Sequence, residues 1–273
     1  MSDVTLTAGM RQNLFALQNT TALMGKTQNR LSTGMKVNSA LDDPVAFFAA
    51  QGHTQRASDL SARKDAMGEA VGLVNAANNG IEAITDLIAA AKSLAQAAQS
   101  ATTTTEQASL MGQFNTMLEN ISTLATDSSY KGTNLLGGTS EKLVVTFDAA
   151  GSQTLTLTGF DAEVNTGLSI ADGSAWGNGS DGNITTTITN LDTAITKLRT
   201  ESKGMANNLS IITTRQDFTD KMMNTLNDGA ANLTNADMNE ESANMLMLQT
   251  RQALGTTSLS LASQAAQSVL RLF

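Results

Sequence analysis

The chain has 273 residues, of which 41% are hydrophobic and only 4% aromatic, and its formal net charge is −8. This apolar content is enough to build a folded core, so the composition excludes wholesale disorder. The basic residues are scattered and form no stripe for phosphates or an anionic surface, so neither nucleic acid nor a membrane is an expected partner. The absence of cysteine excludes disulfides, thiol catalysis and cysteine-ligated zinc.

The N-terminus lacks the pattern of a cleaved secretion signal. The first 25 residues contain Asp3 and Arg11, and their apolar residues are spaced rather than massed together. No run of about 18 apolar residues occurs, so we expect no membrane insertion. The sequence therefore predicts a protein that is cytoplasmic or that is secreted without a cleaved signal peptide.

A first helix is predicted from a narrow stripe with spacings of three and four residues, the pattern of a helix that pairs with another helix. Gly34 is expected to stop this helix, because glycine readily adopts the left-handed conformation that follows a helix end. The stripe consists of Leu14, Leu17, Thr21, Met24, Gln28 and Leu31.

A long second helix is predicted to begin with Asp43 as N-cap and Pro44 in the first turn. The polar residues 100–105 should end it, and a third helix with apolar positions from Leu110 to Leu124 should fold back on it. The expected core positions of the second helix are Met67, Val71, Val74, Asn78, Ile81, Ile84, Ile88, Ala91, Ala95 and Ala98.

The middle of the chain has a different residue pattern from the helical segments on either side. Residues 142–147 (KLVVTF) and 154–160 (TLTLTGF) are rich in β-branched residues and predict a hairpin. Residues 171–183 are predicted as a loop. A long partnered helix should then run from Ile188 to Leu233 with an unbroken heptad pattern, and residues 235–239 should separate it from a final helix.

The predicted fold class is mainly α: an antiparallel long-helix coiled-coil bundle, or rod, with a small β-hairpin and loop insertion between its N- and C-terminal helical halves. We expect three domains. They are a terminal coiled-coil domain (1–43 plus 236–273), a helical rod domain (44–136 plus 184–235) and a small surface insertion (137–183) that protrudes.

The terminal helices are predicted to carry the functional surface. Each has a narrow apolar stripe and no third helix to cover it, so a pair of them is marginal alone and should seek partners in other copies. The expected subunit-interface residues are Leu14, Leu17, Met24, Leu31, Leu254, Leu259, Ala262, Ala266, Val269 and Phe273.

No enzyme or cofactor site is predicted. His53 is the single histidine and cannot by itself form a metal site or a catalytic triad. Capping explains Asp43 and its neighbour Asp42 more simply than a carboxylate pair does. The acidic loop 172–183 lacks the carboxylate spacing of a calcium site. Trp176 is either a ligand contact in an exposed loop or, as we expect, packs on the hairpin.

Several segments resemble bacterial flagellin. Residues 30–43 (RLSTGMKVNSALDD) are similar to a signature of that family, and residues 78–81 (NNGI) and 129–136 (SYKGTNLL) are similar to two further elements. Residues 233–238 (LTNADM), 252–256 (QALGT) and 262–272 are similar to its C-terminal pattern. The resemblance covers roughly residues 1–136 and 186–273.

This resemblance implies a structural subunit that polymerises with itself and other flagellins into the extracellular flagellar filament for motility. It also implies type III export, a chaperone, a filament cap protein and hook-associated proteins as partners. The short middle segment departs from long flagellins. In residues 91–99 only Lys92 is charged, so we expect weak or no recognition by the innate immune flagellin receptor.

Two alternative functions remain open at this level. A hook–filament junction protein would have similar termini but would not polymerise alone. A flagellin-like surface adhesin or glycan-binding protein would use the middle segment as its site.

Overall fold

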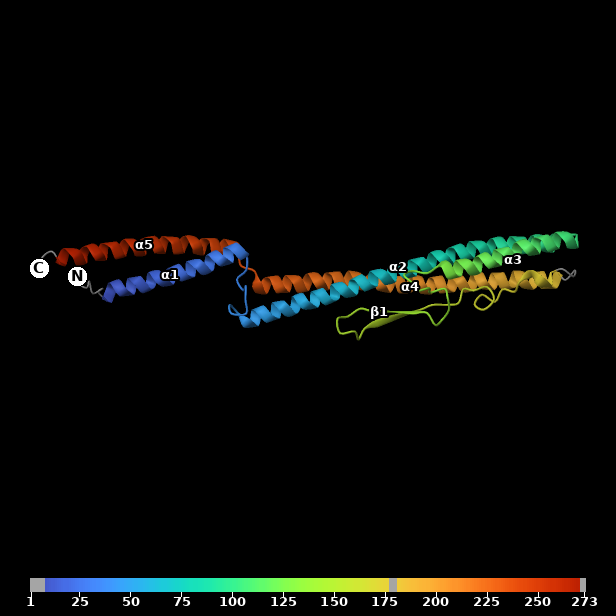
Figure 1. Ribbon diagram of the computed structural model, residues 1–273, viewed down its shortest axis with the longest axis horizontal. Coiled ribbons are helices and arrows are strands. Elements are labelled where there is room, and N and C mark those ends of the chain that lie inside the picture. The colour runs from blue at the N-terminus through green and yellow to red at the C-terminus, as the bar shows by residue number, and fades with distance from the viewer. Residues whose placement is uncertain (1–7, 177–180, 271–273) are drawn as a thin grey trace. The chain divides into compact units, whose positions relative to one another are not determined.

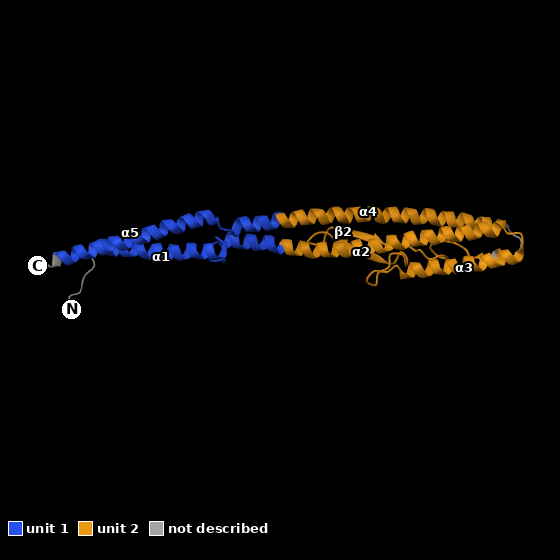
Figure 2. Ribbon diagram, turned by 90° about the horizontal axis from the view of Figure 1, so that it is seen from above, with its two compact units in different colours: residues 1–55, 225–273 blue, residues 56–224 orange. Residues whose placement is uncertain are grey.

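The computed structural model describes residues 8–176 and 181–270, and the chain forms two compact units (Figures 1 and 2). Unit 1 consists of residues 1–55 and 225–273, and unit 2 of residues 56–224. The described residues form five α-helices, one short 3₁₀ helix and one two-stranded sheet. The prediction of a mainly α protein with a small β insertion is confirmed.

Unit 2 is built on three helices. They belong to α2 (Pro44–Ser100), α3 (Thr104–Asp127) and α4 (Asp181–Thr234), of which α2 and α4 extend into unit 1. Residues 101–103 separate α2 from α3, as the polar tract predicts. Thr103 is the N-cap of α3, because its hydroxyl accepts a hydrogen bond from Glu106 N at 3.3 Å. α4 begins earlier than expected, within the predicted loop 171–183.

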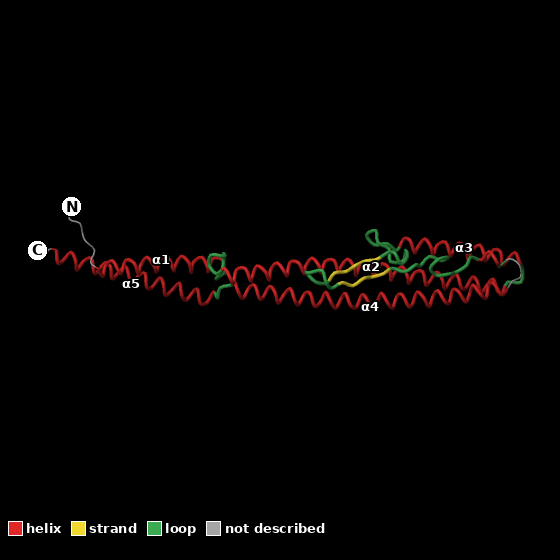
Figure 3. Tube along the Cα trace, turned by 90° about the horizontal axis from the view of Figure 1, so that it is seen from below, coloured by secondary structure: helices red, strands yellow, loops and turns green. Residues whose placement is uncertain are grey.

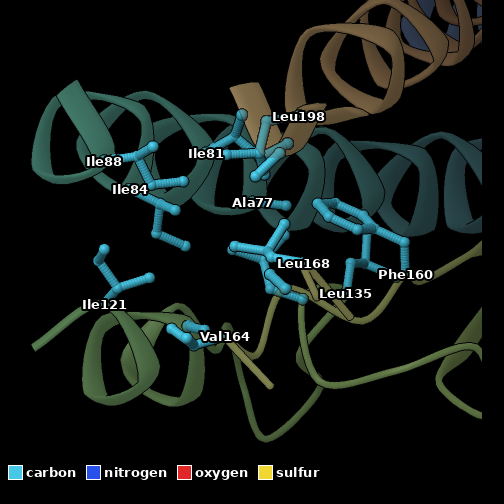
Figure 4. Close-up of a cluster of buried hydrophobic side chains, with 14 of the residues drawn as sticks. Ala77, Ile81, Ile84, Ile88, Ile121, Leu135, Phe160, Val164, Leu168 and Leu198 are labelled. Carbon is cyan, nitrogen blue, oxygen red and sulfur yellow. The ribbon is translucent and has the colours of Figure 1, made fainter. Parts of the chain in front are cut away.

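The core of unit 2 follows the predicted heptads. Ile81, Ile84 and Ile88 of α2 are at most 4% exposed and lie toward Ile121 of α3 and Leu198 of α4 (Figure 4). The same stripe of α2 also contains small residues before and after the isoleucines, which lets the helices approach closely there. The buried alanines of this stripe are Ala70, Ala77, Ala91, Ala95 and Ala98.

The middle segment belongs to this core. Strands β1 (Lys142–Thr146) and β2 (Thr154–Thr158) pair antiparallel with Leu143 opposite Leu157, which confirms the hairpin (Figure 3). The chain that follows the hairpin is buried against the helices rather than protruding. Its buried residues are Phe160, Ala162, Val164, Leu168 and Ile170.

Trp176 follows the short helix η1 (Gly173–Ala175) and is 1% exposed. Its ring lies 4.5 Å from that of Phe114 in α3, and its Nε1 donates to Thr187 Oγ1 in α4 at 3.3 Å. The interpretation as an exposed ligand contact is therefore wrong. The expected packing on the hairpin is not found either, because the indole ring contacts α3 and α4 instead.

Unit 1 contains α1 (Ala8–Thr33) and α5 (Met238–Leu270) together with the nearby ends of α2 and α4. α1 and α5 pack antiparallel, since Arg30 meets Glu241 while Leu17 lies against Gly255. Gly34 follows α1 with a φ of 72° and donates its N–H to Arg30 O at 2.8 Å. The predicted glycine stop is confirmed.

Candidate subunit interface

A backbone clasp joins the two connections of unit 1, residues 34–37 and 232–236. Lys36 N and Val37 N both donate to Thr234 O, at 2.7 and 3.2 Å, and Ala236 N donates to Gly34 O at 2.9 Å. The Lys36 ammonium also donates to Asn232 O at 3.0 Å. The amides of Lys36 and Val37 and the Lys36 ammonium thereby satisfy carbonyls at the C-terminus of α4, where a positive charge is favoured. We call this set of hydrogen bonds the clasp.

An ion pair beside the clasp connects α1 to α5. Arg30 Nη1 donates to Glu241 Oε1 at 2.7 Å, and the side chains are 32% and 8% exposed. Glu241 lies in the first turn of α5, where a carboxylate also interacts favourably with the helix dipole. The guanidinium therefore neutralises a carboxylate that the helix pair largely shields from water.

The contact face of α1 differs in phase from the predicted stripe. Leu17, Met24 and Leu31 are half-buried on this face, but Leu14 is 40% exposed and points away. Polar residues occupy the alternate positions, and Thr27 among them is only 7% exposed. The seam of α1 consists of Met10, Asn13, Leu17, Thr20, Met24, Thr27 and Leu31, and that of α5 of Glu241, Met245, Leu248, Gln252, Gly255, Leu259, Ala262 and Ala266.

The predicted interface residues thus fall into two groups. Leu17, Met24, Leu31, Leu259, Ala262 and Ala266 line the seam within the chain, whereas Leu14 and Leu254 lie outside it, with Leu254 66% exposed. The side chain of Val269 and the whole of Phe273 lie outside the described residues. The structure does not bring the predicted set together on one surface.

Other apolar residues share the outer faces with Leu14 and Leu254. On α5, Met247 and Leu261 lie seven residues before and after Leu254 and are 44% and 61% exposed. Seven residues are nearly two helical turns, so these three side chains form a second stripe that lies outside the seam with α1. The remaining exposed apolar residues are Phe15 and Leu23 of α1 and Met238 and Leu246 of α5.

Sequence reasoning missed a further exposed patch at the start of α2. Leu41 is 96% exposed, Val45 81% and Phe48 60%, and the Phe48 ring contacts that of Phe47 edge-on. We call Leu41, Val45 and Phe48 the α2-start patch. Their spacing of four and three residues was the available signal, because it places apolar groups on one face of a helix start.

The two aspartates before α2 order its N-terminus. Asp43 Oδ1 accepts from Ala46 N at 3.0 Å, and Pro44 is the first helical residue. Asp42 Oδ2 accepts from the backbone N–H groups of Asn38 and Ser39 at 3.2 and 3.1 Å. These two backbone hydrogen bonds lower the pKa of Asp42 from its ordinary value of 3.8, because they stabilise the ionised carboxylate.

Nothing in the described part of the chain resembles a catalytic or metal centre. No group of three or more His, Cys, Asp and Glu side chains there could hold a metal ion. His53 is half-buried on α2 beside Gly229 of α4, within unit 1. A search of the same residues finds no helix with the length and hydropathy needed to cross a membrane.

Comparison with known proteins gives a consistent result. Residues 5–141 match the bacterial flagellin N-terminal helical region, and residues 183–273 match the bacterial flagellin C-terminal helical region. Flagellin FljM of Caulobacter vibrioides is 30% identical over 270 residues, which is 95% of each chain. A flagellin of Brucella melitensis is 28% identical over 268 residues, again 95% of each chain.

A solved structure shares the fold. It is described as a flagellar hook-associated protein from Vibrio parahaemolyticus and aligns over 71% of this chain and all of its own, with a TM-score of 0.62 and 10% identity. At that identity the likeness concerns the fold alone.

Long paired helices with an exposed apolar surface are features of a structural protein that self-associates. The two family matches and the near-complete alignment with flagellins make the identity specific. The chain belongs to the bacterial flagellin family and is a structural subunit of the flagellar filament, which lies outside the cell.

Proposed function

We propose that this flagellin polymerises through the outward faces of unit 1. The observation that carries the proposal is the second stripe of α5, whose members Met247, Leu254 and Leu261 are 44–66% exposed although α5 already has a partner helix. Apolar groups that repeat along a helix outside its seam leave a surface that another copy can cover. Leu14, Phe15 and Leu23 supply the corresponding surface on α1.

The proposal also divides the subunit into three domains with different roles. Residues 1–43 and 236–273 form the filament-core domain, residues 44–136 and 184–235 the helical rod domain, and residues 137–183 the insertion. Support comes from burial: unit 2 has a closed core with many side chains at or near 0% exposure, whereas among the described side chains of α1 and α5 only Met10, Thr27, Glu241 and Leu248 are buried.

The further partners follow the family. We propose secretion through the flagellar type III route without a cleaved signal peptide, with a chaperone, a filament cap protein and hook-associated proteins as partners. We also propose weak or no recognition by the innate immune flagellin receptor. In support, Lys92 is the single charged residue of 91–99, and Asp192 engages its ammonium at 2.5 Å.

Seeded polymerisation tests the main proposal. Purified monomer with filament seeds or a kosmotropic salt should form filaments visible by electron microscopy, because such salts strengthen the burial of apolar surface. Leu254→Ser should raise the critical concentration several-fold, and Leu261→Ser should do the same. Failure of the parent chain to polymerise under every such condition would contradict the proposal.

A truncation separates the two roles. Removal of residues 1–40 and 240–273 should abolish assembly and leave a helical, protease-resistant remainder, since the core of unit 2 is complete without them. Loss of helical circular dichroism in the truncated chain would instead show that the proposed domain division is wrong.

A further inference from the structure

Two grooves of opposite charge lie on either side of the Arg30–Glu241 ion pair in unit 1. The first lies beside the clasp, and its lining includes Asp42, Asp43, Asp237, Glu240 and Glu241 together with Arg30 and Lys36. Five carboxylates against two cations give it a net charge of −3. Arg30 is bound to Glu241 and Lys36 donates to a carbonyl, so the excess is carboxylate. We call it the acidic groove.

The second groove lies between α1 and α5. Its charged lining residues are Lys26, Arg30, Arg251 and Glu241, which give a net charge of +2. Lys26 and Arg251 are both exposed, and no described carboxylate lies within ion-pair distance of either. Leu23 and Met247, 52% and 44% exposed, also line it. We call it the basic groove.

Apolar side chains accompany both grooves. Leu41 and Val45 of the α2-start patch are sequence neighbours of Asp42 and Ala46, which line the acidic groove. Met247 of the basic groove belongs to the second stripe of α5. Each groove is therefore bordered by exposed hydrophobic side chains, and the net charges of the two grooves are opposite.

We infer that the acidic groove and α2-start patch of one copy receive the basic groove and second α5 stripe of another copy of this chain. Lys26 and Arg251 would then face Asp42, Asp43 and Glu240, while Met247 would cover Leu41 and Val45. This inference rests on the proposed function, which it deepens by naming the two surfaces that meet.

The arrangement of the grooves favours an open polymer. Glu240 and Arg251 are 11 residues apart on α5, which corresponds to about 16 Å along the helix. A copy that places its basic groove on the acidic groove of its neighbour is displaced by about that distance, and each end of the row keeps one groove free. Such head-to-tail pairing continues, whereas a two-fold pairing closes after two copies.

The size of the contact fits cooperative assembly. A stable dimer uses about 20–30 residues on each side, far more than these grooves offer. One such contact is therefore too small to hold two free subunits together, and it becomes effective when a subunit meets several neighbours at a filament end. Electrostatic attraction between the grooves would also orient the incoming subunit.

Cysteine cross-linking tests this inference, because the natural chain has no cysteine. Leu41→Cys and Met247→Cys are made as single variants, mixed in equal amounts, polymerised from seeds in reductant, and then oxidised mildly. We expect a disulfide-linked dimer that contains one molecule of each variant. The matched control pairs Leu41→Cys with Ser260→Cys, a position that is exposed on α5 but lines neither groove, and should cross-link several-fold less.

A double variant carrying Leu41→Cys and Met247→Cys distinguishes the two symmetries. Head-to-tail pairing should give a ladder of dimers, trimers and longer products on a non-reducing gel. A product that stops at dimers would overturn the head-to-tail arrangement, and Leu41→Cys homodimers alone would show that the patch pairs with itself. If a cysteine variant fails to polymerise in reductant, Val45→Cys with Leu23→Cys probes the same contact.

Charge variants at Arg251 test the electrostatic part of the contact. Arg251→Glu should reduce the cross-linking yield several-fold, whereas Arg251→Lys should retain it, because only the former reverses the charge that faces the acidic groove. Normal filaments without cross-links would overturn the inference and leave the proposed function intact. Absence of filaments from the parent chain would overturn both.

Discussion

Arg30 of α1 donates a hydrogen bond to Glu241 of α5 at 2.7 Å, and this ion pair joins residues 211 positions apart in the sequence. It lies in the last turn of one terminal helix and the first turn of the other. The seam beyond it contains several polar residues, and its leucines other than Leu248 are only half-buried, so this pair is a principal contact between α1 and α5.

Arg30→Met should lower the free energy of unfolding of unit 1 by about 2 kcal/mol, because it leaves the largely buried Glu241 carboxylate without its partner. Thermal unfolding followed by circular dichroism measures this change. Lys64→Met is the control, since Lys64 and Asp220 are 39% and 41% exposed and such a pair contributes about 0.5 kcal/mol or less. Equal losses in both variants would contradict a special role for Arg30.

Leu17→Ala and Leu14→Ala should separate folding from assembly. Leu17 packs closely against Gly255: a Cβ added at Gly255 would lie 2.8 Å from Leu17 Cδ2. Truncation of the Leu17 side chain to alanine should therefore destabilise the α1–α5 pair by about 2 kcal/mol. Leu14 is exposed and should leave monomer unfolding unchanged but raise the critical concentration for polymerisation. Destabilisation of the monomer by Leu14→Ala would instead place Leu14 in the seam, as the stripe predicted from the sequence does.

Gly80→Ala and Gly112→Ala should have opposite effects, although both glycines lie inside helices. A Cβ at Gly80 would approach Leu136 Cδ1 to 2.7 Å and collide with Ser128, so we expect destabilisation by about 1–3 kcal/mol. No atom lies within 4 Å of a Cβ at Gly112, so alanine there should stabilise α3 by about 0.5–1 kcal/mol. Chemical denaturation of the two variants gives the comparison directly.

Acid should loosen the connection before α2. The folded-state pKa of Asp42 is lowered, so its contribution to stability is present above the ordinary value of 3.8 and is lost as the pH falls through the lower folded pKa. The protection of the Asn38 and Ser39 amides against hydrogen exchange, measured relative to the intrinsic exchange rate at each pH, should therefore fall at pH values below 3.8. Asp42→Asn should show fast exchange already at pH 6, and an unchanged rate would contradict this role.

The long helices were predictable because their cores are heptads of branched apolar residues. The pattern from Ile188 to Leu233 predicted most of α4, and the isoleucines of α2 lie where the spacing placed them. The stripe predicted for α1 was right at Leu17, Met24 and Leu31 but wrong at the alternate positions, because Asn13 and Thr27 occupy the seam there while Leu14 is exposed. A hydrophobic stripe marks apolar residues, but it cannot tell a partner in the same chain from one in another copy.

The middle segment was less predictable for a different reason. Its buried residues, such as Val164 and Leu168, follow no helix or strand period, because an irregular chain is held by the surface that it covers. Trp176 likewise has its partners, Phe114 and Thr187, on two different helices. Only the position of the segment between three helices explains these contacts.

The clasp gives the subunit a mechanical property. It ties the segment that follows α1 to the segment that precedes α5, through short backbone hydrogen bonds between residues about 200 positions apart. Tension applied to either terminal helix is therefore shared between the two crossings of the chain instead of being borne by one flexible connection.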